Sequence, residues 1–352
     1  MPSSASRACS APTSALGFLA AGLARRRQTG APGITVISCD NLPKNGETLK
    51  AVLLEFAQLK DDGLARWIEA NVAFASSMVD RIVPATTPAD RAEVDAGLGL
   101  ADAWPVMAEP AFDWVIEDRF PGGRPLFEAS GVRFVGDVEP YEEMKLRLLN
   151  GAHTAIAAIG RLAGLQTVPE TVRDKRVQRF LAAYWAEAAP TLSIDAETAA
   201  AYGAALLPRF ANPALPHRTA QIATDASLKV PQRLLAPLRI RRARGENAPA
   251  ILFAIAAYIR SCRGIDDAGQ MFEVSDPLME RWGDKPAKEL SPEAGIDAFL
   301  GFESVFGADL RLDGDVVAVL KEFARTIAEN GVLGAIEARF GGLPDDNGRT
   351  EQ

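Results

Sequence analysis

The chain changes character at Tyr141-Glu142-Glu143-Met144-Lys145-Leu146-Arg147-Leu148-Leu149-Asn150-Gly151-Ala152-His153, a run with apolar residues at helical spacing. From this run onward, Ala and Leu recur every three or four residues, which is the pattern of helices that pack on one another. The pattern predicts long helices at 139–165, 169–188, 196–209, 225–239, 248–263 and 316–328.

Before this run, strand-like and helix-like segments alternate. A β-branched run predicts a strand at 33–38, and short apolar runs predict further strands at 72–76, 104–107, 112–116 and 132–135. Apolar spacing predicts an amphipathic helix at 13–29, with a basic last turn at Arg25-Arg26-Arg27, and a second helix at 47–69 that breaks near 61–63. The sequence therefore predicts a disordered lead at 1–12, an α/β domain at 13–136 and a mostly helical domain at 137–352.

Composition excludes several classes of function. The formal net charge of −8 over 352 residues argues against a nucleic acid or an anionic membrane as the main partner. The three cysteines are far apart, which argues against disulfides and zinc knuckles and favours a reducing compartment, the cytoplasm. Only two histidines are present, His153 and His217, so a histidine-rich metal site is excluded.

No apolar stretch is long enough to span a membrane. Residues 15–24 follow Arg7 and faintly resemble the core of a signal peptide. Three arginines follow them directly and a strand pattern comes next, which favours a helix of the folded protein instead.

The run quoted above also gathers polar side chains. A helix turns by about 100° per residue, so with Lys145 at zero the angular positions around the axis are about 60° for Glu142, about 80° for His153 and about 140° for Asn150. The other directions carry apolar side chains, so the helix should be buried. Burial disfavours the charged form of a lysine, and a lysine with a lowered pKa can act as a general base near neutral pH.

A purely structural interpretation of these residues is also open. Alone, Lys145 would extend to solvent and His153 would be a satisfied core histidine. Three polar residues on one side of a buried helix favour a functional site, because perturbed polar groups gather at such sites.

Oxidation of an alcohol without a metal needs few groups: a base for the hydroxyl proton, donors for the developing alkoxide, and a nicotinamide for the hydride. Lys145 can be the base, and the side-chain amides of Asn150 and Asn41 can be the donors. Asn41 follows the carboxyl end of the strand at 33–38, where α/β sheets bind ligands. By itself Asn41 would be a turn or helix-cap residue.

At this point the sequence resembles the mannitol dehydrogenase family, the long-chain, metal-independent polyol dehydrogenases that include fructuronate reductases. The resemblance extends from about Ser14 to near the C-terminus and rests on four ordered motifs. These are Ser38-Cys39-Asp40-Asn41-Leu42-Pro43-Lys44-Asn45-Gly46; Val72-Ala73-Phe74-Ala75-Ser76-Ser77-Met78-Val79-Asp80-Arg81-Ile82-Val83-Pro84; Lys-x4-Asn-x2-His at Lys145, Asn150 and His153; and Arg209-Phe210-Ala211-Asn212-Pro213 followed by Ile222-Ala223-Thr224-Asp225-Ala226-Ser227-Leu228-Lys229-Val230-Pro231.

The resemblance implies a fold and a reaction centre. Residues 13–136 would be part of a dinucleotide-binding, Rossmann-type domain, and residues 137–352 a substrate domain similar to the helical C-terminal domain of 6-phosphogluconate dehydrogenase. Lys145 would be the general base, and Asn41 and Asn150 would hold the substrate oxygen. The cofactor would be NAD or NADP, without a metal.

The resemblance also implies the residues around that centre. His153 and Lys229 would bind other substrate hydroxyls, and Asp80, like Asn41, would lie near the cofactor and the substrate. Glu142 is a candidate relay that passes the proton of Lys145 to solvent. For Asp80 an ion pair with Arg81 that closes a turn is an equally open interpretation.

The chain departs from the family pattern in two places. It has no Gly-x-Gly-x-x-Gly at its start, so the first βαβ unit, which cradles the pyrophosphate, is expected to be absent. The family usually has Arg eight residues before Lys229, where this chain has Gln221. A glutamine cannot pair with a carboxylate, which favours an uncharged polyol over a uronate, although Arg218 could compensate.

The leading prediction is therefore an NAD(P)-dependent oxidoreductase that interconverts a sugar alcohol and its ketose, of the mannitol–fructose type. Three alternatives stay open: a fructuronate reductase of the same family, an inactive truncated remnant that binds no nucleotide, and a longer protein whose start lies upstream. The expected partner is a small polyol or ketose, bound by a monomer or a weak oligomer.

Overall fold

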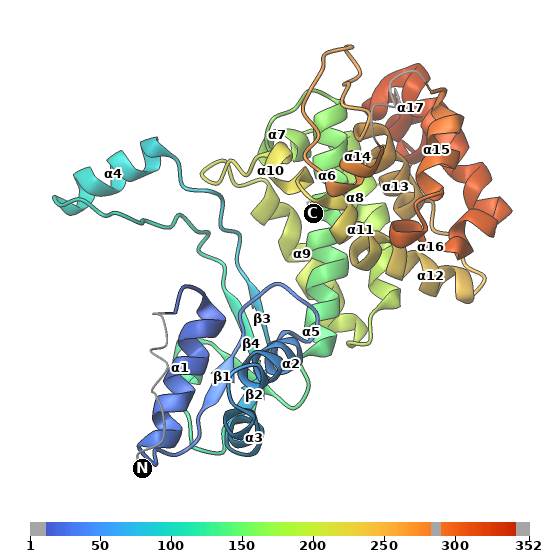
Figure 1. The fold of residues 1–352 in the computed structure, drawn as a ribbon. Coiled ribbons are helices and arrows are strands. Elements are labelled where there is room, and N and C mark those ends of the chain that lie inside the picture. Colours follow the sequence, from blue (N-terminus) through green and yellow to red (C-terminus); the bar gives the residue numbers. More distant parts are fainter. Residues whose placement is uncertain (1–11, 283–289, 343–352) are drawn as a thin grey trace. The chain divides into compact units, whose positions relative to one another are not determined.

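A computed structural model describes residues 12–282 and 290–342 (Figure 1). The chain folds into two compact units: unit 1 takes its residues from Met1–Arg81 and Phe112–Glu142, and unit 2 from Ile82–Ala111 and Glu143–Gln352. Apart from Pro12, the lead predicted at 1–12 lies outside the described residues. The predicted domain limits, 13–136 and 137–352, stay a prediction.

Unit 1 is an α/β structure with short strands. Strand β1 (Thr35–Ile37) pairs in parallel with β2 (Ala73–Ala75). Strand β3 (Ser77–Asp80) pairs antiparallel with β4 (Asp113–Glu117), which pairs in parallel with β5 (Arg133–Val135). The strands predicted at 33–38, 72–76, 112–116 and 132–135 are thus confirmed, whereas β3 was not predicted.

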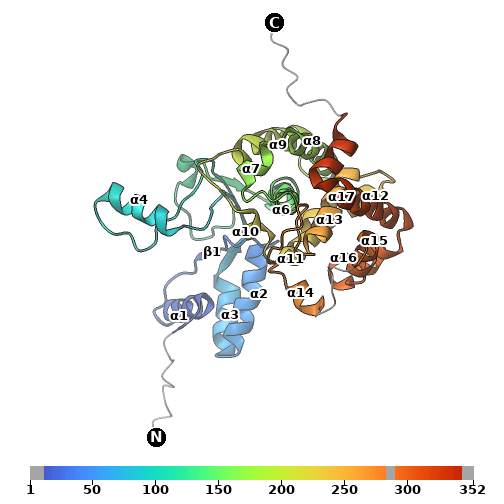
Figure 2. The ribbon, with the colours of Figure 1, turned by 90° about the horizontal axis from the view of Figure 1, so that it is seen from above.

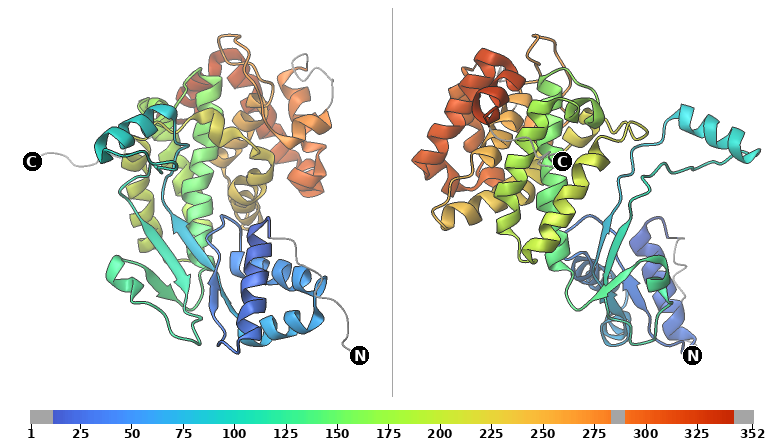
Figure 3. Two further views of the ribbon diagram at one scale, coloured as in Figure 1. Left: turned by 60° about the vertical axis from the view of Figure 1, so that its left-hand side comes forward. Right: turned by 180° about the vertical axis from the view of Figure 1, so that it is seen from behind.

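Three helices cover the β1–β2 pair: α1 (Ala15–Gln28), α2 (Asn45–Gln58) and α3 (Asp62–Asn71), the blue elements in Figure 3. The predicted break near 61–63 is confirmed, because the Asp61 side chain accepts from the Gly63 N–H and caps α3. Gly46 allows α2 to begin close to the sheet, since a Cβ there would lie 2.6 Å from the Ser76 nitrogen.

The strand predicted at 104–107 is wrong. Trp104 is 79% exposed, and Pro105 and Pro110 interrupt the backbone donors that a strand needs. The sequence analysis also missed a helix that precedes this segment, α4 (Pro88–Leu98), which begins with a capping box between Thr87 and Asp90.

Unit 2 is an assembly of helices around two buried ones, α6 (Gly151–Leu162) and α13 (Pro249–Ser261), which pack against each other. Figure 2 shows α6 nearly end-on, with further helices of this unit around it. These are α7 (Val168–Val172), α8 (Lys175–Ala188), α9 (Ala196–Phe210), α10 (Thr219–Ala223), α11 (Ala226–Val230), α12 (Ala236–Ala243), α14 (Pro277–Trp282), α15 (Pro292–Leu300), α16 (Glu303–Leu312) and α17 (Gly314–Phe340).

Two of the predicted helices contain a π-helical turn. The helix predicted at 139–165 is α5 (Glu139–Met144), a π-turn at Lys145–Asn150, and then α6. The Gly151 N–H bonds to the Leu146 carbonyl, five residues back. The expectation of one regular helix at about 100° per residue is therefore wrong at Lys145–Asn150, the segment that carries the predicted base and one predicted amide donor.

The second π-turn, Pro231–Leu235, joins α11 to α12 and packs against the first. Pro231 has no N–H, so the regular α-helical ladder cannot continue through it.

Among the described helices, none is both long enough and apolar enough to cross a membrane.

Candidate active site

The first π-turn and α6 present the Lys-x4-Asn-x2-His motif within unit 2. Lys145 is half-buried, Asn150 is 7% exposed and His153 is 6% exposed. In the described part of the chain, Asn150 Nδ2 and His153 Nε2 are both buried without a hydrogen-bond partner. Buried polar atoms are rarely left unpaired in folded proteins, so both atoms are suited to meet a ligand.

His153 lies among aromatic rings and positive charges. Its ring centroid is 4.4 Å from that of Phe210 and 5.7 Å from that of His217. Burial holds the pKa of His153 well below its usual range, and the nearby charges of His217, Arg233, Arg209 and Lys145 lower it further. His153 is therefore a neutral imidazole at pH 7.

Lys229 reaches the same region from α11. Its Nζ donates to the Thr224 carbonyl at 2.5 Å and to the Ile222 carbonyl at 3.4 Å. Burial lowers the pKa of Lys229, and the charge of Arg233 lowers it further. Burial lowers the pKa of His217, and the charge of Lys229 lowers it further; His217 Nδ1 is buried and without a hydrogen-bond partner among residues 12–282 and 290–342.

Arg233, on the second π-turn, is a cation that the sequence analysis missed. Burial lowers the pKa of its guanidinium to about 10, so it stays charged at pH 7. Its Nη1 donates to Thr154 Oγ1 at 3.2 Å, and within the described chain it forms no ion pair with a carboxylate. Arg209 differs, because its guanidinium is 2.7 Å from Glu109 Oε1. The arginines carry no sequence signal that separates a paired one from an unpaired one.

Unit 1 holds the other residues predicted from the sequence. Asn41 is exposed in the loop after β1, and Asp80, 2% exposed, ends β3. The loop of Asn41 is tied down by Asn45, which was not singled out from the sequence. Asn45 Nδ2 donates to the Asp40 carbonyl at 2.8 Å and to the Ser77 carbonyl at 2.7 Å. Asn45 thus joins the loop after β1 to the start of β3.

Glu142 lies at the other end of the motif, three residues before Lys145. It is 7% exposed, its Oε2 accepts from the Lys44 N–H at 3.2 Å, and its Oε1 is buried without a partner in the part of the chain described. Burial raises the pKa of Glu142, and the charges of Glu139, Glu117 and Asp137 raise it further. Such a carboxyl group can exchange a proton closer to neutral pH than an ordinary glutamate can.

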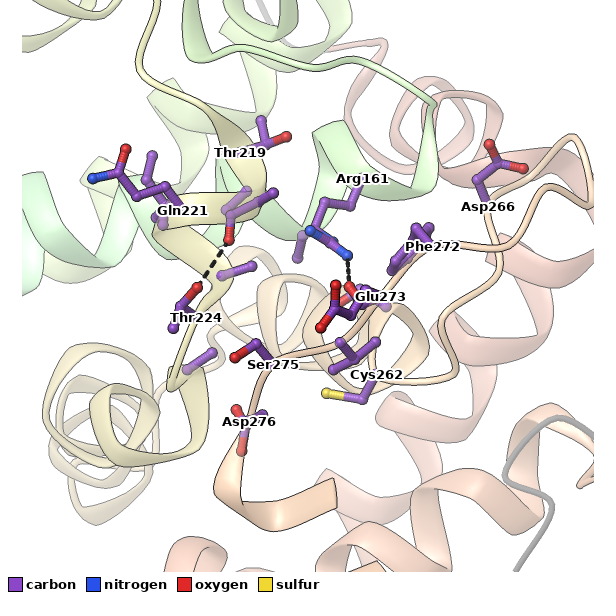
Figure 4. Close-up of a pocket in the computed structure, with 18 of the residues that line it drawn as sticks. Arg161, Thr219, Gln221, Thr224, Cys262, Asp266, Phe272, Glu273, Ser275 and Asp276 are labelled. Atoms are coloured by element: carbon purple, nitrogen blue, oxygen red, sulfur yellow. Dashed lines mark hydrogen bonds between the residues drawn. The ribbon is translucent and has the colours of Figure 1, made fainter. Parts of the chain in front are cut away.

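Unit 2 also contains a cavity of about 470 Å³, enclosed by α6, α10 and the segment that leads into α14 (Figure 4). Arg161 donates to the Glu273 carbonyl at its edge. Gln221 lines this cavity and is exposed, at the position where the family usually has arginine. Neither Lys145 nor His153 lines it, so the predicted substrate residues and this cavity are separate features.

The described residues fit one end of a nicotinamide cofactor. A parallel pair, β1–β2, is followed by the loop of Asn41 and by Asp80 at the end of β3, the edge at which such sheets bind nucleotides. Residues 12–282 and 290–342 contain no glycine-rich pyrophosphate loop and no group of three acidic, histidine or cysteine side chains that could hold a metal ion.

Comparison with known families gives two matches. The model of the mannitol dehydrogenase Rossmann domain matches residues 5–129, and the model of the mannitol dehydrogenase C-terminal domain matches residues 137–328. The predicted order of a Rossmann-type part and a helical part is thus confirmed.

Individual relatives and structures agree with these matches. The D-mannonate oxidoreductase of Escherichia coli is 39% identical over 93% of this chain and 68% of its own length. The mannitol 2-dehydrogenase of Aspergillus terreus is 38% identical over 92% of this chain and 64% of its own length. The chain thus spans about two thirds of the length of these relatives.

Two solved structures are similar to this one. Mannitol 2-dehydrogenase of Pseudomonas fluorescens, solved as a ternary complex with NAD and D-mannitol, has a TM-score of 0.78 at 35% identity over 93% of this chain and 66% of that one. A substrate-free D-sorbitol dehydrogenase has a TM-score of 0.82 at 33% identity over 92% of this chain and 67% of that one.

Proposed function

The chain belongs to the mannitol dehydrogenase family, and we propose that it interconverts an open-chain sugar alcohol, or its acid, and the corresponding ketone with NAD(P) and Lys145 as general base. The observation that carries the proposal is the pair of buried, unpartnered atoms in the described chain, Asn150 Nδ2 and His153 Nε2, on the same helical run as Lys145. A hydroxylated ligand would satisfy both atoms.

Lys145 begins the oxidation. Its neutral amine accepts the proton of the hydroxyl on the carbon that is oxidised. Asn150 and Asn41 donate hydrogen bonds to that oxygen, whose negative charge grows as the C–H bond breaks. In the reverse direction the Lys145 ammonium returns the proton to the carbonyl oxygen. NAD(P), when bound, supplies the nicotinamide carbon that accepts the hydride and returns it.

The neighbouring residues orient the substrate through its other hydroxyl groups. His153 is neutral because of its lowered pKa, so its Nε2 can hydrogen-bond a hydroxyl without adding charge beside Lys145. Lys229 binds a more distant hydroxyl, and Asp80 holds the nicotinamide end of the site together with the loop of Asn41. Glu142, with its raised pKa and unpartnered buried Oε1 in the described chain, takes the proton from Lys145 toward solvent.

The deciding experiment compares Lys145→Ala with the unaltered chain. NADH formation with mannitol or mannonate should fall about 10³-fold, because a positioned general base contributes about 10²- to 10⁴-fold. NADH binding, measured by fluorescence titration, should remain. Lys175→Ala is the matched control, since this lysine is exposed on α8, and it should keep full turnover.

Two results would contradict the proposal. Unchanged turnover in Lys145→Ala would remove the lysine from its role. An unaltered chain that binds no NADH at millimolar concentration would favour the alternative of a catalytically inactive chain.

A second candidate concerns the substrate, and Arg233 favours it. Arg233 is half-buried and has no carboxylate partner in the described chain, and its charge lowers the pKa of both His153 and Lys229. A half-buried cation without a counter-charge is best satisfied by an anionic ligand. A hexonate would bring that carboxylate, whereas Gln221 favours an uncharged polyol.

Arg233→Gln separates the two substrates. The kcat/KM for mannonate should fall about 10- to 100-fold, as expected for the loss of a charged hydrogen-bond partner. The kcat/KM for mannitol should change less than about threefold. An equal loss with both substrates would show that Arg233 supports the fold and does not select an acid.

A further inference from the structure

Two side chains of α8 hold the π-turn that carries Lys145 and Asn150. The Tyr184 hydroxyl donates to the Arg147 carbonyl at 2.7 Å, and Trp185 Nε1 donates to the Leu148 carbonyl at 3.0 Å. Both acceptors lie inside the π-turn Lys145–Asn150.

One carbonyl of such a turn needs a donor from outside the helix for a geometric reason. Where a helix returns from bonds five residues back to bonds four residues back, one carbonyl is passed over. Buried carbonyls without a partner are costly, so a π-turn in a protein core requires a donor from elsewhere. Tyr184 and Leu148 are both fully buried. Solvent therefore cannot replace the Tyr184 hydroxyl as the donor to the π-turn.

Gly151 makes room for the phenol. A Cβ at this position would lie 1.9 Å from the Tyr184 hydroxyl oxygen and 3.0 Å from the Arg233 carbonyl oxygen. The backbone of Gly151 is ordinary right-handed helix, so glycine is not required there by its conformation. Glycine costs about 1 kcal/mol in a helix relative to alanine, and the space for Tyr184 accounts for its presence.

The same hydroxyl also reaches the second π-turn. Its oxygen lies 3.3 Å from the carbonyl oxygen of Arg233, so the single phenol proton is shared between two acceptors, with Arg147 the closer one. Tyr184 therefore links the segment of Lys145 and Asn150 to the segment that follows Lys229.

We infer that Tyr184, assisted by Trp185, is a positioning residue that fixes the π-turn and so sets the directions of Lys145 and Asn150. The inference rests on the proposed role of Lys145. The inference means that removal of the Tyr184 phenol oxygen lets the π-turn relax toward a regular α-helix and rotates Lys145 relative to His153.

Tyr184→Phe tests this with the ring retained. The kcat should fall about 10- to 100-fold with little change in KM, because small misplacements of a catalytic group have effects of this size. The dependence of kcat on pH should change as well, because Lys145 leaves its environment. Tyr258→Phe is the matched control: this tyrosine is 3% exposed on α13, and its hydroxyl forms no hydrogen bond of good geometry in the described chain.

A coupled pair of variants sharpens the test. Gly151→Ala should lower kcat in the unaltered chain, because the added methyl group displaces the Tyr184 hydroxyl. In the Tyr184→Phe background the same substitution should cost at least fivefold less, since the closest clashing atom is gone. Strictly additive effects would overturn the inference.

Hydrogen exchange gives a readout that does not depend on turnover. The amides of 146–154 should exchange about tenfold faster in Tyr184→Phe and at the normal rate in Tyr258→Phe. If the unaltered chain has no activity, the proposed reaction fails while this measurement still tests the link. Faster exchange with unchanged kcat and pH profile would make Tyr184 structural only, and unchanged exchange would overturn the link itself.

If Tyr184→Phe does not fold, Trp185→Phe removes only the donor to Leu148 and takes its place in the same measurements.

Discussion

Helices α6 and α13 lie side by side in the core of unit 2, and both are buried nearly all round. They differ in the polarity of their buried side chains and in the regularity of the backbone. In α13 the buried side chains are mostly apolar, and its backbone is regular from Pro249 to Ser261. The run that enters α6 contains a π-turn, and it leaves Asn150 Nδ2 and His153 Nε2 without partners in the described chain.

The contrast separates packing from preorganisation. Helix α13 stabilises the unit through area removed from water. The run into α6 lacks regular α-helical hydrogen bonding and leaves polar atoms unpaired in the described chain, which lowers stability. It also directs polar groups toward the candidate active site. The expected consequence is that substitutions in α13 change the free energy of unfolding, whereas substitutions around the π-turn change turnover more than stability.

The largest expected loss of stability is at Phe253 in α13. This side chain is fully buried, with its ring centroid 5.5 Å from Phe180 and 5.3 Å from Phe323. Phe253→Ala should lower the free energy of unfolding by about 3–5 kcal/mol, because it creates a cavity in a packed core. Urea titration followed by circular dichroism measures the loss, and turnover per folded molecule should stay near normal.

Phe18→Ala is its control, because Phe18 is 63% exposed on α1. A loss below about 1 kcal/mol at Phe253 would mean that α13 is not the packing element of the comparison.

A smaller loss is expected at Glu187, which holds the start of α13. Its carboxylate accepts from the N–H groups of Ala250 and Ile251, at 2.9 Å each. Glu187→Ala leaves two buried donors unpaired and should lower the free energy of unfolding by about 1–3 kcal/mol. The measurement is urea titration at pH 7. An unchanged midpoint would indicate that water replaces the carboxylate.

Much of this contrast could be predicted from the sequence, for identifiable reasons. The apolar spacing predicted helices in both regions, the all-round apolar pattern predicted that the helix of Lys145 is buried, and the spacing of Lys145, Asn150 and His153 predicted where polar groups would gather. The π-turn could not be predicted, because the donors that permit it, Tyr184 and Trp185, lie 37 residues from the carbonyls they bind. Apolar spacing looks alike in a regular helix and in one with a single wider turn.

Long-range pairing explains the other differences. Nothing near Arg233 in the sequence shows that it lacks a carboxylate partner in the described chain, while Arg209 has one in Glu109, 100 residues away. The segment around Trp104 was predicted as a strand from local apolarity, but a strand needs a neighbour, and the fold provides none for it.

The smallest expected effect is a change in pH dependence at His153. The folded protein lowers the pKa of this histidine well below about 6.5, so between those two values the unfolded chain binds more protons. The contribution of His153 to stability is therefore fully present above about pH 6.5 and is lost as the pH falls toward the pKa of the folded state.

His153→Gln cannot bind this proton, so its free energy of unfolding should fall less between pH 8 and about pH 5.5 than that of the unaltered chain. Urea titrations of both proteins at the two pH values measure the difference. Some dependence should remain in the variant, because burial and the charge of Lys229 also lower the pKa of His217. Parallel losses in the two proteins would mean that the fold does not lower the pKa of His153, which would contradict the effect of burial described above.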